Sequence, residues 1–266
     1  MPLAPDMAFL LLLLLRMAVA AAFVVSASMI TERSGPVVGA LISTLPISAG
    51  PVYIFLARDH DAAFIADSAL AALPINAATL VLGLIYTLLA QRHTLFVSFG
   101  AALLAWLALS IAAHGINWSF AGGLAVNAVA AAVCLPLAQR FRKVAMPPIR
   151  RRWYDVPLRA LLVATLVAVG VGLSDRVGPV VTGIVTVFPI VSISLMLILH
   201  PRIGGRATAA VIANGLWGLV GFGLGVATLH LAAVPLGSWG ALLLALVVCV
   251  GWNLGLWQLS RRGAAR

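Results

Sequence analysis

The segment ERSGPVVGALISTLPI at residues 32–47 returns as DRVGPVVTGIVTVFPI at residues 175–190. The offset of 143 positions holds without a gap from residue 15 to residue 56, and it aligns Leu15-Arg16 with Leu158-Arg159. Apolar residues recur by chance in helices rich in Leu, Ala and Val, but two prolines, a glycine and charged residues seldom recur in register. We therefore expect an internal duplication, and this duplication decides the predicted fold.

The composition places both copies in a membrane. Of the 266 residues, 63% are hydrophobic and 9% are charged, and the mean hydropathy is +1.12. Soluble domains are about half apolar and about a quarter charged, so a water-soluble fold could not hide this much apolar surface. The apolar runs are about 20 residues long, the length at which a helix crosses ~30 Å of hydrocarbon. We expect an all-α polytopic membrane protein with about nine transmembrane helices, at residues 8–30, 36–57, 62–90, 94–113, 118–138, 156–174, 178–199, 207–229 and 236–259.

The basic loops predict the orientation of these spans. Loop 139–155 carries Arg140, Arg142, Lys143 and three further arginines, and cytoplasmic loops favour Lys and Arg. Because each span crosses the membrane once, successive loops lie on alternate sides. Counting spans in both directions from this cytoplasmic loop places the N-terminus outside and the C-terminus in the cytoplasm. The first apolar run has no basic residue before it and continues past Arg16 to Ile30. We expect it to be a retained span and not a signal peptide.

The span count makes the two copies inverted repeats. Residues 1–113 form repeat 1, residues 114–155 form a linker helix with the basic cytoplasmic loop, and residues 156–266 form repeat 2. Four spans return the chain to its starting side, and the linker helix then crosses once more, so the second copy has the opposite topology. Inverted repeats recur in secondary transporters. A single misplaced span would make the repeats parallel.

Matched prolines mark the expected site. Pro46 and Pro189 lie near the middle of the second helix of each repeat. Proline removes a backbone hydrogen bond, and the freed groups need partners, which favours a protein interior or a wet cavity over lipid. The alternative is a plain structural kink. Breaks of this kind present helix ends to a ligand, and the predicted substrate-binding residues are Arg16, Ser43, Pro46, Ser48, Thr186, Pro189 and Asn214.

Two charged residues are predicted within the spans. Arg16 lies roughly 12 Å below the outer boundary at about 1.5 Å per residue, and a buried guanidinium usually faces the bundle interior and marks a site. The alternatives are a structural ion pair or a side chain that snorkels outward. Asp67 is expected at a similar depth, where it either pairs with Arg16 or acts as a proton or cation carrier. For Asn214, an interhelical hydrogen bond is the alternative to lining a cavity.

Several function classes are not expected. The net charge of +10 follows from arginines collected in loops, so we predict contact with membrane lipids and no nucleic-acid partner. Cys134 and Cys249 lie inside apolar runs and are typical of packing residues. The sequence contains no HExxH, GxSxG or P-loop pattern, and we predict neither an enzyme nor a bound metal or cofactor.

The second half contains short family-like features: Gly183 through Phe188-Pro189, a basic turn ending at Arg206, Asn214-Gly215-Leu216-Trp217, and Gly251-Trp252. Over roughly residues 157–260 the chain resembles the small GlpM-like bacterial inner-membrane proteins of four spans. It departs from their pattern by being a fused double unit with a linker helix. The resemblance implies a multi-pass protein of the bacterial inner (plasma) membrane, and it carries over no chemistry.

These observations favour a small secondary transporter that moves a small anionic solute, because a buried arginine and helix N-termini both suit an anion. Coupling to protons would use Asp67. One alternative is a protein that binds or translocates a phosphate-bearing lipid, which would have a lateral opening between helices. Another is a non-transporting scaffold or assembly factor, which would be a tightly packed bundle. Whether the chain forms a homo-oligomer is left open.

Overall fold

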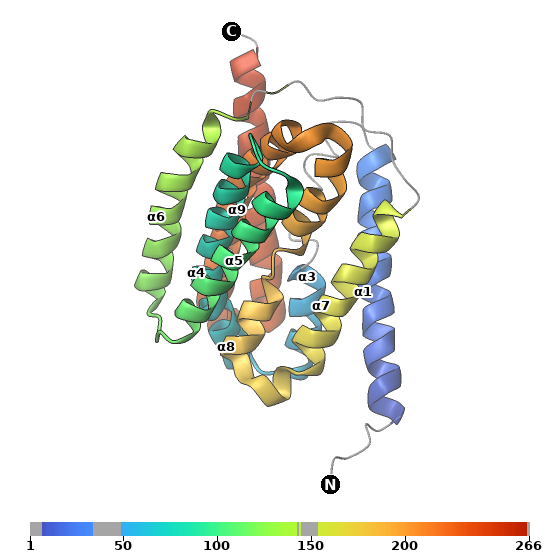
Figure 1. The fold of residues 1–266 in the computed structure, drawn as a ribbon. Coiled ribbons are helices and arrows are strands. Elements are labelled where there is room, and N and C mark those ends of the chain that lie inside the picture. The colour runs from blue at the N-terminus through green and yellow to red at the C-terminus, as the bar shows by residue number, and fades with distance from the viewer. Residues whose placement is uncertain (1–6, 34–48, 143, 145–153, 265–266) are drawn as a thin grey trace.

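The computed structural model describes residues 7–33, 49–142, 144 and 154–264, and all regular structure in these residues is helical (Figure 1). Five helices in the described residues are long and apolar enough to cross a membrane. The predicted all-helical fold is confirmed, and these helices are consistent with a membrane protein. The helices are α1 (Met7–Arg33), α3 (Ala49–Asp59), α4 (Ala62–Leu89), α5 (Leu95–His114), α6 (Phe120–Gln139), α7 (Asp155–Gly172), α8 (Ser174–Thr186) and α9 (Ile190–Ala264).

Helix α9 is interrupted twice by glycines with positive φ. Gly204 has φ 82° and Gly237 has φ 73°, a region that glycine enters without a steric penalty. The residues on either side of Gly237 pack against each other in reversed order, since Gly225 faces Cys249 while Gly221 faces Trp252. The chain therefore turns back at Gly237, close to the boundary predicted between the last two spans.

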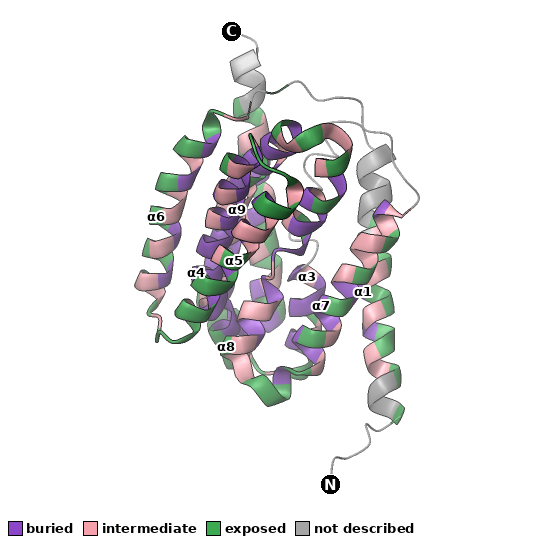
Figure 2. Ribbon diagram, in the orientation of Figure 1, coloured by how far each residue is buried: buried purple, intermediate pink, exposed green. Residues whose placement is uncertain are grey.

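Helix α4 forms the centre of the bundle, where it packs against α5, α6, α8 and α9 (Figure 2). It is buried along most of its length, and its largest fully buried side chains include Ile65, Leu73 and Tyr86. The outer helices instead turn apolar side chains outward, among them Leu104 of α5 and Val129 of α6, which are 68% and 62% exposed. An apolar outer face around a packed interior is the pattern that a lipid solvent permits.

The segment of α9 between Gly204 and Gly237 runs antiparallel to α4. Three pairs of contacts fix this direction. The Ala66 carbonyl contacts the His230 ring, Asn76 contacts Leu219, and Gly205 packs on the Ala90 carbonyl. Residue numbers rise along α4 as they fall along α9. Helices α1 and α7 also pack together and run in opposite directions (Figure 1).

Candidate functional site

An ion pair joins α1 to the end of α3. Both terminal nitrogens of Arg16 donate to the Asp59 carboxylate, one of them over 2.8 Å, and the guanidinium lies 5.8 Å from the Phe55 ring centre. The Arg16 side chain is 11% exposed and that of Asp59 is 25% exposed. The pair neutralises the arginine, which is therefore not a free anion ligand in this arrangement.

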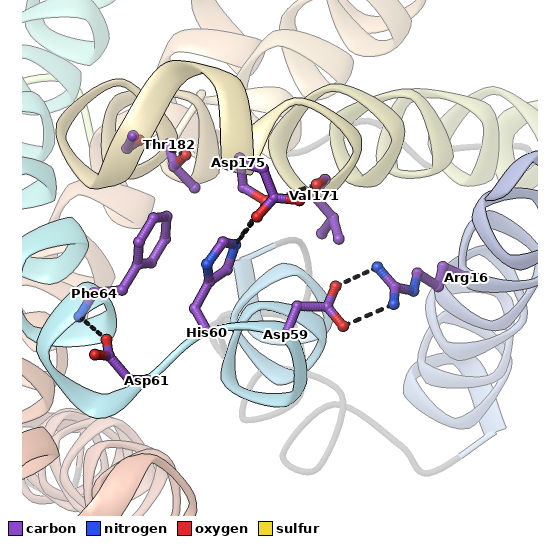
Figure 3. A network of polar contacts seen from close by, with 10 residues as sticks. Arg16, Asp59, His60, Asp61, Phe64, Val171, Asp175 and Thr182 are labelled. Carbon is purple, nitrogen blue, oxygen red and sulfur yellow. Dashed lines mark hydrogen bonds and ion pairs between the residues drawn. The ribbon is translucent and has the colours of Figure 1, made fainter. Parts of the chain in front are cut away.

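Of the two roles left open for Asp67, the ion pair with Arg16 does not form. Asp67 is exposed on α4 and makes no ion pair with Arg16, which instead binds Asp59. Helix α4 is apolar around most of its circumference, so hydropathy gave no signal for the side on which Asp67 lies. Asp59 was assigned to a loop beyond the second span, yet it ends α3 facing α1 (Figure 3).

His60, next to this pair, connects the two halves of the chain. Its Nε2 lies 2.8 Å from the Ser174 hydroxyl and 3.7 Å from the Asp175 carboxylate, and its ring stacks on Phe64 (Figure 3). Asp61 caps α4 by accepting a hydrogen bond from the Phe64 amide. No motif or spacing in the sequence pointed to His60, so this junction was not predicted.

A second ion pair lies at the opposite end of the bundle. Arg202 donates to Asp155 over 2.7 Å, and its guanidinium lies 5.1 Å from the Tyr154 ring centre. Arg202 and Asp59 are 143 positions apart, the offset of the predicted duplication. In each predicted copy an ion pair thus joins the residues after the second span to the first helix, and the acid and the base are exchanged between the two pairs.

The break expected at Pro189 is complete. Helix α8 ends at Thr186 and α9 begins at Ile190, with a buried Pro189 between them. The Thr186 hydroxyl donates to the Thr182 carbonyl within α8, so it is engaged within its own helix. Ser43, Pro46 and Ser48 lie outside the described residues.

Asn214 lies far from Arg16. Its side chain accepts a hydrogen bond from Arg142 Nε over 2.7 Å and donates to the Ala210 carbonyl. The neighbouring Leu216 packs at Gly83, about twenty residues along α4 from Asp59, or roughly 30 Å at 1.5 Å per residue. Arg16, Thr186 and Asn214 therefore do not form one binding site.

A pocket of about 430 Å³ lies between α1, α3 and α9. The described lining comes from Phe23, from residues 49–51, 53 and 54, and from parts of α9 between Phe222 and Cys249, and none of these described residues is charged. Three lining residues, Phe23, Trp239 and Leu243, are 51%, 58% and 64% exposed. The pocket therefore opens to the outside of the bundle, where a membrane would present lipid.

Tyr53, one of the lining residues, brings a hydroxyl group. The Tyr53 hydroxyl lies within hydrogen-bonding reach of the Ser68 hydroxyl on α4, and both residues are buried. Neither hydroxyl has another partner in the described part of the chain. A buried hydroxyl that lacks partners costs free energy, so this pair has hydrogen-bonding capacity to spare beside a largely apolar pocket.

Among the described residues, no group of three or more His, Cys, Asp or Glu side chains could hold a metal ion. Comparison with family models, with curated proteins and with solved structures gives no match for this chain. The resemblance to GlpM-like proteins thus stays a prediction, and the function is argued from the arrangement of the residues.

Proposed function

We propose that this protein is a membrane carrier built from two inverted repeats, which takes an amphipathic, lipid-like molecule into the pocket between α3 and α9. The observation that carries the proposal is the position and lining of that pocket. Its walls come from both copies of the repeat, and its mouth is on the outer face of the bundle.

Three features support the inverted arrangement. The third helix of the first copy, α4, is antiparallel to its counterpart in the second copy, the middle segment of α9. The first helices of the two copies, α1 and α7, are also antiparallel (Figure 1). The ion pairs of Asp59 and Arg202 lie at opposite ends of the bundle although the two residues occupy equivalent positions. The glycine turns in α9 allow it to supply three of the nine proposed spans.

The proposed setting is the bacterial inner membrane, with the N-terminus outside and the C-terminus in the cytoplasm. The alternation of the helices supports this orientation. One end of the bundle carries the basic residues Arg140, Arg142 and Arg202. The opposite end carries Asp59, His60 and Asp175. Cytoplasmic loops favour the basic end.

An alkyl chain suits this pocket better than a small anion does. Moving an unpaired ion into an apolar site costs many kcal/mol, and Arg16 already neutralises Asp59. A lipid chain is in an apolar solvent before and after it enters, so its transfer is nearly neutral in free energy. Selectivity must then come from the polar end of the ligand, for which the lining residues Tyr53 and Trp239 carry hydrogen-bond donors.

Translocation in proteoliposomes tests the proposal. A fluorescent phospholipid is bleached by a membrane-impermeant reductant only in the outer leaflet, and a carrier speeds the loss of the inner-leaflet signal. We expect acceleration by the wild type and slower translocation by Ala245→Leu, which narrows the pocket. Ala112→Leu, on the exposed side of α5, is the matched control and should behave like the wild type. No acceleration by well-folded wild-type protein would overturn the proposal.

A second candidate, the transport of a small anion, is favoured by one observation. The chain is non-helical at the buried Pro189, where the C-terminal end of α8 and the N-terminal end of α9 meet inside the bundle, and the N-terminal end of a helix can bind an anion. Uptake of inorganic phosphate and small carboxylates into the same vesicles measures this activity. Uptake that is unaffected by Ala245→Leu would favour this candidate over the lipid carrier.

A further inference from the structure

A hollow of about 650 Å³ lies at the C-terminal end of α6, away from the apolar pocket. It is lined by Pro136, Gln139, Arg140 and Arg142. Neither arginine forms an ion pair with an acidic side chain in the described part of the chain, where Asp59 and Asp155 bind Arg16 and Arg202. The hollow therefore holds two positive charges that lack a carboxylate counter-ion among these residues.

Arg142 is held in place by α9. Its Nε donates to Asn214 Oδ1 over 2.7 Å, its guanidinium lies 5.7 Å from the Trp217 ring centre, and Asn214 Nδ2 donates back to the Arg142 carbonyl over 3.4 Å. Side-chain entropy usually weakens the binding of an anion by a surface arginine. Here Asn214 and Trp217 fix the side chain beforehand, while the two terminal nitrogens of the guanidinium remain available to bind an anion bidentately.

The exposed surface of α6 on the N-terminal side of the hollow is apolar. Val129, Val133 and Leu137 are 62%, 51% and 40% exposed. Their spacing of four residues places them in one stripe along α6, and the stripe ends one turn before Arg140. A charged hollow at the end of a lipid-facing stripe matches the two parts of a phospholipid.

We propose that Arg140 and Arg142 bind the phosphate headgroup of an anionic phospholipid, whose chains lie along Val129, Val133 and Leu137. Asn214 acts as a positioning residue that holds Arg142. Free phosphate shares the headgroup chemistry, but the apolar stripe favours the lipid. This site is independent of the carrier function, because it uses none of the residues that line the apolar pocket.

The test compares the melting temperature of the purified protein with added phosphatidylglycerol, phosphatidylcholine or soluble glycerol phosphate. Ligand binding raises the melting temperature by mass action. We expect phosphatidylglycerol to stabilise the wild type and the other two to have little effect. Arg142→Ala should abolish most of the shift, while Arg206→Ala should keep it, since Arg206 is exposed and outside the hollow.

Asn214→Ala separates a built site from general charge attraction, since it leaves the net charge unchanged. We expect an apparent affinity for phosphatidylglycerol about tenfold weaker, from the loss of the hydrogen bond that holds Arg142. Arg142→Lys, which keeps the charge but loses the planar fork, should also weaken binding and serves if Asn214→Ala fails to fold. Equal shifts in Arg142→Ala and Arg206→Ala, or equal stabilisation by glycerol phosphate, would overturn the proposal.

Discussion

The side-chain amide of Asn76 donates a hydrogen bond over 3.0 Å to the carbonyl oxygen of Leu219, the residue that stands 143 positions later at the repeat offset. If the proposed duplication continues at this offset beyond residue 56, the two positions are equivalent, and equivalent positions touch only close to the axis that would relate the copies. Because α4 and this part of α9 are antiparallel, that axis would be perpendicular to the helices. In a membrane-spanning bundle it would lie in the plane of the bilayer, as in inverted-repeat transporters.

The first prediction concerns the amides at this crossing. Asn76 also donates to Asn127 of α6 over 2.8 Å, and Asn127 donates to the Leu73 carbonyl. A double-mutant cycle of Asn76→Ala and Asn127→Ala should give a coupling free energy of about 0.6 kcal/mol, with ~1.7 kcal/mol as an upper bound for such bonds in membrane helices. Unfolding in mixed micelles measures it. Additive single effects would show that the amides do not act as a unit.

The ion pair between α1 and α3 gives the second prediction. Asp59→Asn leaves the Arg16 guanidinium buried without a counter-charge, and we expect it to lower the free energy of unfolding by roughly 1–3 kcal/mol, since the pair is only partly buried. Asp67→Asn is the matched control and should change stability little, because Asp67 is exposed. Thermal unfolding measures both variants, and equal effects would contradict the Asp59 assignment.

Close packing of α8 on α4 gives the third prediction. A Cβ atom at Gly183 would collide with the backbone carbonyl of Ser68, so Gly183→Ala must push the two helices apart. Overpacking of this kind costs about 1–3 kcal/mol. Gly215→Ala is the control, because no atom lies within 4 Å of a Cβ there. A variant at Gly183 as stable as the one at Gly215 would argue against this contact.

Sequence patterns predicted those elements that depend on local hydropathy. The span expected at 62–90 is α4 at Ala62–Leu89, and the span expected at 118–138 is α6 at Phe120–Gln139. Contacts between residues far apart in the sequence were harder to predict. The pair of Arg16 with Asp67, one of two roles expected for Asp67, rested on depth alone, since the hydropathy of an apolar helix does not indicate which way a side chain faces.

The candidate site was only partly predictable for a related reason. Charged and proline-flanking residues attracted attention because they are costly in a membrane, whereas the pocket between α3 and α9 is lined by ordinary apolar side chains. For Asn214 a cavity position and a hydrogen bond between helices were both left open, and its partner is Arg142, a residue 72 positions away. Such a pair has no local signature in one sequence.

The central claim is that the repeats are inverted, and labelling of equivalent loops tests it most directly. His93 lies between α4 and α5, after the third proposed span of the first copy. Leu236 lies next to the interruption of α9 at Gly237, after the third proposed span of the second copy, and both residues are exposed. Each is replaced singly by cysteine in a background where Cys134 and Cys249 are alanine, and intact cells are treated with a membrane-impermeant thiol reagent. We predict that Leu236→Cys is labelled in intact cells and that His93→Cys is labelled only after permeabilisation. Labelling of both positions from the same side would contradict the inverted arrangement.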